Sequence, residues 1–110
     1  MTTIRLVLAD DHPLYRDGVA RTLQDSGGIE VVGQAQDGAA ALCLQLRPDL
    51  VLLDVSMPKG GGIGALTQIM AMEKPPLVAM LTASEDEADL MQALRLGAAG
   101  YILKGVGARD

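Results

Sequence analysis

The feature that most constrains how this chain can fold is an uninterrupted apolar run, Leu50–Leu53, which ends in the carboxylate of Asp54. A continuous Leu/Val run is typical of a strand that is covered on both faces, because a strand with one wet face would alternate apolar and polar residues. Such strands belong to parallel sheets, whose carboxyl edge is where ligands bind. We therefore expect Asp54 to lie where a buried strand reaches the surface.

Three further apolar runs also end in polar residues that could do chemistry. The runs and the residues that follow them are Ile4–Ala9 with Asp10 and Asp11, Leu77–Leu81 with Thr82, and Tyr101–Leu103 with Lys104. If all four runs are parallel neighbours in one sheet, their carboxyl ends share an edge. Three carboxylates, a hydroxyl and an ammonium group would then converge there.

Helix signals separate these runs along the chain. The expected helices begin at Pro13, near Gly38, near Ile63 and after Ser84, and they end at Ser26, before Pro48, before Pro75 and at Gly97. One more strand, the second in chain order, is expected at Ile29–Gly33, and its Glu30 indicates an edge position. Alternating strands and helices predict an α/β fold, a doubly wound parallel sheet in a single domain of 110 residues.

Composition narrows the possible functions. The formal net charge is -5, which opposes binding to nucleic-acid phosphates by this domain alone. Phe and Trp are absent, so the core is expected to be aliphatic, and the single cysteine, Cys43, is expected to be a small core residue. The run Ile4–Ala9 is too short for a signal peptide or a membrane span, so a cytoplasmic protein without membrane contact is expected.

The acidic residues suggest a chemistry. Two unit charges about 4 Å apart repel by about 4 kcal/mol at an effective dielectric constant near 20, so clustered carboxylates need protonation or a hard cation such as Mg²⁺. An aspartate beside Mg²⁺ can attack phosphorus and form an aspartyl phosphate. The Lys104 ammonium and the Thr82 hydroxyl would then offset charge on the phosphoryl oxygens.

The chain resembles a known family, the receiver domains of response regulators, over essentially its full length. The residues that carry the resemblance are Asp10-Asp11, Asp54 with Met57-Pro58, Thr82-Ala83, Tyr101 and Lys104. Asp10–Pro13 and Gly100–Lys104 are similar to the NarL/FixJ/LuxR-type subgroup, whose members are usually fused to a helix-turn-helix DNA-binding domain. The resemblance implies a flavodoxin-like, five-stranded sheet of order 2-1-3-4-5.

The resemblance also implies site roles. Asp54 would accept a phosphoryl group from the phosphohistidine of a sensor histidine kinase or from a small acyl phosphate. Asp11 and Asp54 would bind Mg²⁺ directly, Asp10 through water, and Ser56 through its backbone carbonyl. The domain would promote only its own phosphorylation and dephosphorylation.

A switch is implied as well. Thr82 would move toward the phosphoryl group and Tyr101 would swing inward behind it. Their coupled shift would remodel the face of the fourth helix and fifth strand, which output partners recognise. In the parent protein, that output would control transcription.

Two departures from the family pattern stand out. Lys59–Gly62 replaces acidic or bulkier residues that are common in this loop, and the chain ends six residues after Lys104, where the family continues into a fifth helix. We therefore expect a receiver domain truncated before that helix, without an output domain. The missing helix would leave an apolar strip near the fourth and fifth strands, which predicts self-association into a dimer or higher oligomer.

Other interpretations remain open. Asp10 or Asp11 could cap the first helix, and His12 is more typical of a loop or capping residue than of a phosphodonor or metal ligand. A phosphatase with an aspartyl-phosphate intermediate is disfavoured because Ser56 occupies the place of its usual general acid. A receiver-like domain that is never phosphorylated is disfavoured by the complete acidic set. Gly60–Ala65 fits a dinucleotide-binding fingerprint only weakly.

Overall fold

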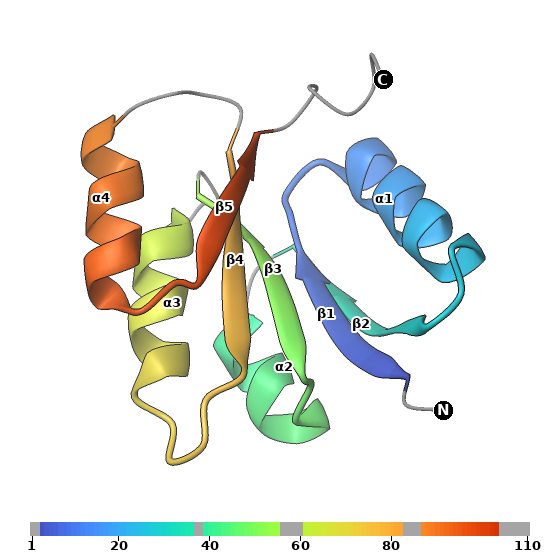
Figure 1. Ribbon diagram of the computed structural model, residues 1–110, viewed down its shortest axis with the longest axis horizontal. Helices are drawn as coiled ribbons and strands as arrows, with labels where there is room; N and C mark the ends of the chain where they lie inside the picture. The colour runs from blue at the N-terminus through green and yellow to red at the C-terminus, as the bar shows by residue number, and fades with distance from the viewer. Residues whose placement is uncertain (1–2, 37–38, 56–60, 83–86, 104–110) are drawn as a thin grey trace.

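The computed structural model describes residues 3–36, 39–55, 61–82 and 87–103, which form five strands and four helices (Figure 1). In chain order these elements are β1 (Ile4–Ala9), α1 (Pro13–Asp25), β2 (Ile29–Ala35), α2 (Ala39–Leu46), β3 (Leu50–Asp54), α3 (Gly61–Met70), β4 (Leu77–Thr82), α4 (Glu87–Leu96) and β5 (Gly100–Leu103). The predicted alternation of strand and helix is confirmed. None of the helices in these ranges is long and apolar enough to span a membrane.

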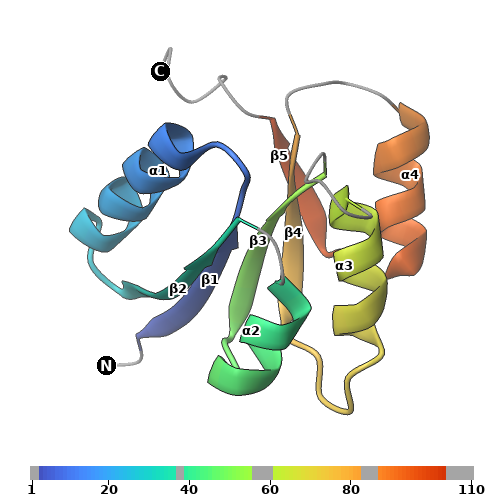
Figure 2. The same cartoon turned by 180° about the vertical axis from the view of Figure 1, so that it is seen from behind.

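The strands form one parallel sheet in the order β2-β1-β3-β4-β5 (Figures 1 and 2). This order confirms the one implied by the family resemblance, and it places β2 at an edge as Glu30 indicated. β2 extends to Ala35, two residues beyond its predicted end, because it continues to pair with β1, where Ala9 lies opposite Ala35. The first and third strands are adjacent, with Ala9 opposite Leu53.

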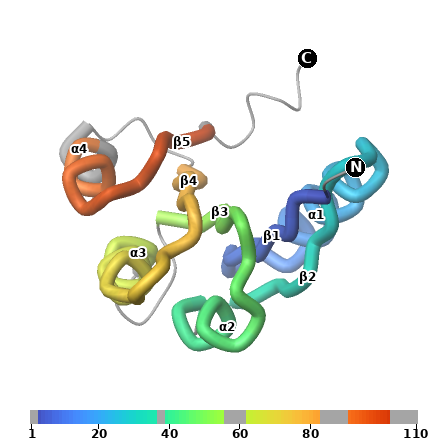
Figure 3. Tube along the Cα trace, turned by 60° about the horizontal axis from the view of Figure 1, so that its bottom comes forward, coloured from blue at the N-terminus to red at the C-terminus, as the bar shows by residue number. Residues whose placement is uncertain are grey.

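The helices divide between the two faces of the sheet. Residues of α1 pack on one face against Leu6, Leu8 and Leu52, whereas α2, α3 and α4 cover the other face (Figure 3). That second face holds the larger cluster, with Leu53 and Met80 fully buried. Because the central strands are covered on both sides, β3 has to be apolar at every position before Asp54, as the run Leu50–Leu53 predicted.

The core is aliphatic, as the composition predicted. Cys43 of α2 is fully buried within the larger cluster, which confirms its predicted place in the core. Burial raises the pKa of the Cys43 thiol to about 11, because the charged thiolate is poorly solvated there. The residue is therefore a neutral thiol at physiological pH.

Two helix ends follow their sequence signals. Pro13 occupies the first turn of α1, where its missing N–H removes no helical hydrogen bond. Gly97 follows the last residue of α4 with φ of +116°, a conformation that residues with a side chain rarely adopt. Both boundaries are confirmed.

Two apolar side chains of the predicted strip are exposed. Ile102 of β5 lies opposite Leu81 of β4, so it shares the α1 side of the sheet, yet 49% of its surface is accessible. Leu77 at the start of β4 is also exposed. Residues 104–110, where the sequence departs from the family pattern, lie outside the described residues, and self-association through the strip stays a prediction.

Candidate functional site

Two buried carboxylates meet at the carboxyl edge of the sheet. Asp54 is the last residue of β3, and Asp10 directly follows β1, the neighbouring strand. Both residues have 0% of their surface exposed, although carboxylates almost never lie fully buried without a partner. The adjacency of β1 and β3 therefore brings together two acids that are 44 residues apart in the chain.

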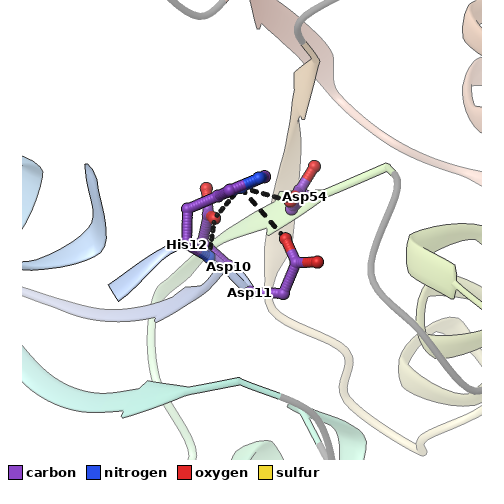
Figure 4. Close-up of side chains that lie close together, drawn as sticks. All are labelled: Asp10, Asp11, His12 and Asp54. Carbon is purple, nitrogen blue, oxygen red and sulfur yellow. Dashed lines mark hydrogen bonds and ion pairs between the residues drawn. The ribbon is translucent and has the colours of Figure 1, made fainter. Parts of the chain in front are cut away.

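Asp11 and His12 complete the group, which we call the acidic cluster: Asp10, Asp11, His12 and Asp54 (Figure 4). One ligand atom from each of the four residues lies within 4.8 Å of all the others. The side chain of Asp11 is 26% exposed and that of His12 is 63% exposed. The cluster is therefore buried on the side of Asp10 and Asp54 and open to solvent on the side of Asp11 and His12. The predicted convergence of the three carboxylates is what the structure shows.

The donor set of this cluster suits a hard divalent cation. Carboxylate oxygens are the ligands that Mg²⁺ and Ca²⁺ prefer, and Mg²⁺ is usually bound by one or two carboxylates with several waters retained. Three acids in one small, partly buried site repel one another, so a bound cation would stabilise them. The residues present therefore fit the Mg²⁺ site that the sequence predicted.

His12 lies over the carboxylates. Its Nδ1 is 3.1 Å from Asp10 Oδ1, 3.1 Å from Asp11 Oδ1 and 3.9 Å from Asp54 Oδ2, as the dashed lines in Figure 4 show. Its backbone N–H donates to Asp10 Oδ1 at 2.8 Å, which closes a local turn after β1. His12 is the N-cap residue of α1 by position, as expected, but its side chain makes no capping hydrogen bond.

Arg16 was not singled out by the sequence as a site residue, and the structure connects it to the cluster. Its Nη1 donates to the backbone carbonyl of Asp10 at 2.7 Å, and its backbone N–H donates to the carbonyl of His12 at 2.9 Å. The first turn of α1 thereby holds the loop that carries Asp11. The available signal was position, since Arg16 stands four residues after His12 and one helical turn brings it back to that loop.

Thr82 and Tyr101 lie on the neighbouring strands. Thr82 is the last residue of β4, beyond Leu81, which pairs with Asp54, so it reaches the same edge as the acidic cluster. It is nearly fully buried. Tyr101 of β5 pairs with Met80 and therefore shares the sheet face of Met80 and Thr82, with 49% of its surface exposed.

The remaining predicted site residues lie outside the described part of the chain. They are Ser56, Met57, Pro58, Ala83 and Lys104. Their roles, and those assigned to the acidic cluster, Thr82 and Tyr101, stay predictions.

Sequence comparison supplies an independent observation. Residues 6–110 match the sequence profile of the response regulator receiver domain. The "Probable transcriptional regulatory protein NarL" of Mycobacterium tuberculosis is 46% identical over 103 residues, covering 92% of this chain and 48% of that protein. The response regulator GacA of Pseudomonas viridiflava is 41% identical over 106 residues, covering 94% of this chain and 50% of that protein. The chain thus spans about half the length of these curated relatives.

Solved structures show the same similarity. The signal receiver domain of NarL from Mycobacterium tuberculosis superposes with a TM-score of 0.89 at 41% identity, covering 96% of this chain and 86% of that one. A LuxR-family two-component response regulator from Aurantimonas sp. SI85-9A1 gives a TM-score of 0.90 at 31% identity, covering 99% of this chain and 79% of that one.

Proposed function

The chain belongs to the response regulator receiver domain family, and from that premise we propose that Asp54 accepts a phosphoryl group and thereby switches a partner-binding surface. It is the receiver domain of a two-component response regulator, homologous to the transcriptional regulators NarL and GacA. Receiver domains are generally signalling modules and not enzymes acting on a separate substrate.

The observation that carries the proposal is the burial of Asp54 beside Asp10 and Asp11 at the carboxyl edge of the sheet. In the proposed site, Asp11 and Asp54 would hold Mg²⁺ directly, Asp10 would hold it through water, and Ser56 would contribute its backbone carbonyl, as the family resemblance implies. Bound Mg²⁺ supplies positive charge to the phosphoryl oxygens. The cluster's opening toward solvent leaves room for a phosphoryl donor to reach Asp54.

The reaction is a transfer between two nucleophiles. A carboxylate oxygen of Asp54 forms a bond to phosphorus while the bond from phosphorus to the histidine nitrogen of the kinase breaks, and that nitrogen keeps the electron pair. The Lys104 ammonium and the Thr82 hydroxyl offset negative charge on the transferred group. The placement of Thr82 at the end of β4, one strand from Asp54, supports its part in this scheme.

The family resemblance implies the switch, and the arrangement of β4 and β5 supports it. When Thr82 moves toward the phosphoryl group, it leaves space on the sheet face that it shares with Tyr101, and the half-exposed Tyr101 ring turns inward to fill that space. Met91 and Leu94 of α4 are exposed. The face of α4 and β5 is therefore the surface that changes on phosphorylation.

The partners follow from the family. The donor is a cognate histidine kinase, and the parent protein controls transcription, as the name of the relative NarL suggests. The family resemblance implies a separate helix-turn-helix DNA-binding domain for that output. We expect the acidic receiver domain itself not to bind nucleic-acid phosphates, since its formal net charge is -5. Removing this domain from the parent protein is expected to remove phosphorylation control and not DNA contacts.

Direct phosphorylation tests the proposal. The chain is incubated with Mg²⁺ and acetyl phosphate, and covalent phosphate is measured by intact-mass spectrometry beside the Asp54→Asn variant. We expect saturable, Mg²⁺-dependent labelling of the native chain only. Equal labelling of both proteins would assign the phosphate to another residue, and turnover of small phosphomonoesters would favour a phosphatase.

A further inference from the structure

We infer that His12 is a fourth ligand of the acidic cluster through Nδ1, and that it gives the site a preference for divalent transition ions such as Co²⁺. The inference rests on the proposed function, because His12 would act at the same metal site as the three carboxylates. It goes further by assigning a ligand atom that changes which metals the site selects. The sequence favoured a loop or capping position for His12, and the residue does occupy the N-cap of α1, but its side chain makes no capping hydrogen bond and lies beside the carboxylates.

The distances around His12 match a coordination shell. Two ligands at right angles on an ion, each roughly 2.1 Å from it, stand about 3.0 Å apart, and two opposite ligands stand about 4.2 Å apart. The Nδ1 atom is 3.1 Å from one oxygen of Asp10 and 3.1 Å from one of Asp11. Its 3.9 Å separation from Asp54 Oδ2 lies between the two ideal values. One small ion can therefore contact His12, Asp11 and Asp54 after sub-ångström adjustments, with Asp10 held through water as in the proposed function.

The local backbone directs the imidazole toward the carboxylates. The hydrogen bond from His12 N–H to Asp10 Oδ1 and that from Arg16 N–H to the His12 carbonyl hold the residue from both sides. The side chain does not cap α1, so the helix does not engage it. Nδ1 lies within hydrogen-bond distance of Asp10 Oδ1 without a metal, and to bind an ion the ring would carry its hydrogen on Nε2 and direct the Nδ1 lone pair to that ion.

The imidazole of His12 and the neighbouring carboxylates prefer different metal ions. Mg²⁺ prefers oxygen ligands and keeps several waters, so an imidazole adds little to its affinity. Imidazole suits ions such as Zn²⁺, Cu²⁺ and Ni²⁺, and affinity for mixed nitrogen and oxygen sites rises from Mn²⁺ through Co²⁺ to Cu²⁺. His12 should therefore strengthen Co²⁺ binding selectively.

A spectroscopic signal from a metal-bound histidine nitrogen can be assigned to a single residue of this chain. His12 is the only histidine of the 110 residues, so any histidine coordinated to metal is His12. Cys43 is the only thiol, and it is fully buried in the core on α2. A Cys43→Ala variant therefore serves as a matched control for binding by sulfur.

The test titrates Co²⁺ and Mg²⁺ separately into tag-free native chain, His12→Ala, His12→Asn, Cys43→Ala and Asp54→Asn. Affinities come from calorimetry, and proton NMR follows the paramagnetically shifted exchangeable N–H of a Co²⁺-bound imidazole. We expect both His12 variants to lose that signal and to bind Co²⁺ at least about tenfold more weakly. Mutating a residue that only hydrogen-bonds to a metal ligand already weakens metal binding by about this factor. Their Mg²⁺ affinity should stay within about threefold of native, and Cys43→Ala should behave as native.

Other outcomes separate the two proposals. If the native chain and both His12 variants bind Co²⁺ equally while Asp54→Asn binds neither ion, His12 is not a ligand and the proposed Mg²⁺ site stands. Loss of Co²⁺ binding in Cys43→Ala would also overturn the inference. If neither the native chain nor any variant binds Mg²⁺ or Co²⁺, the result contradicts the metal site of the proposed function and, with it, the role of His12 as a ligand. Circular dichroism of each variant verifies that it is folded.

Discussion

The carboxylate of Asp54 is needed for the proposed function but destabilises the fold, because its buried charge lies close to the carboxylates of Asp10 and Asp11. Replacing it with asparagine keeps its shape and removes one charge. In the absence of divalent metal, we expect Asp54→Asn to be more stable than the native chain by about 1 kcal/mol or more, since like charges at this spacing repel by several kcal/mol. Thermal unfolding in EDTA would show this as a rise of about 4–8 °C.

Added Mg²⁺ is the internal control for that prediction. Mg²⁺ should stabilise the native chain, because an ion that binds only the folded state raises the free energy of unfolding. It should hardly affect Asp54→Asn, because that variant lacks one of the proposed metal ligands. An equal or lower melting temperature for the variant in EDTA would contradict the electrostatic conflict.

The buried thiol of Cys43 should make the stability of the fold depend on pH in the alkaline range. Its pKa is raised from 9.0 to about 11 in the folded chain, so the unfolded chain loses this proton first as pH rises. The contribution of the neutral thiol is fully present below pH 9 and is lost as pH rises to about 11. Urea unfolding at pH 8 and pH 11 should therefore show the native chain losing about 2–3 kcal/mol more than Cys43→Ala. Parallel losses in both proteins would contradict burial of the thiol.

At the scale of elements, the start of α3 is packed against the end of β3. Gly62 donates its N–H to the carbonyl of Val55 at 2.9 Å, and a Cβ at Gly62 would overlap the backbone carbonyl of Asp54. This contact explains why a glycine stands at position 62 of the stretch Lys59–Gly62, in which the sequence departs from the family pattern. The glycine allows α3 to begin directly beside the acidic cluster.

Two alanine substitutions in α3 test this packing. Gly62→Ala should destabilise the chain by about 1–3 kcal/mol and weaken Mg²⁺ binding, because the backbone of Asp54 must move. Gly64→Ala is the matched control: its Cβ would meet nothing within 4 Å, so it should stabilise by about 0.5–1 kcal/mol through helix propensity. Urea unfolding and Mg²⁺ calorimetry measure both effects. Similar behaviour of the two variants would exclude the close approach as the reason for Gly62.

At the scale of the whole molecule, the proposed switch transmits a change from the acidic cluster to the face of α4 and β5. Beryllofluoride with Mg²⁺, which mimics the phosphoryl group on Asp54, should shift backbone amide NMR signals of β4, α4 and β5, including that of Tyr101. The shifts should be absent in Asp54→Asn and reduced in Thr82→Ala, because Thr82 couples the two regions. Changes confined to the residues around Asp10 and Asp54 would mean binding without switching.

Much of this architecture could be predicted from local pattern. The continuous run Leu50–Leu53 indicated a strand buried on both faces, and Glu30 indicated an edge strand; the sheet confirms both. Pro13 and Gly97 marked helix ends because their backbone preferences act within a few residues. Strand β2 was predicted two residues short because pairing with β1 extends it, and that pairing is not a local property.

The sequence by itself determined the strands, the helices and the acids at the strand ends, because solvent and backbone sterics act on each short segment separately. Only the tertiary structure decided that the His12 ring lies over three carboxylates, that Arg16 binds the carbonyl of Asp10, and that Gly62 abuts Asp54. These contacts depend on where β1 and β3 place their neighbouring loops and helices. Such distances are set by packing across the sheet, which no short stretch of sequence encodes.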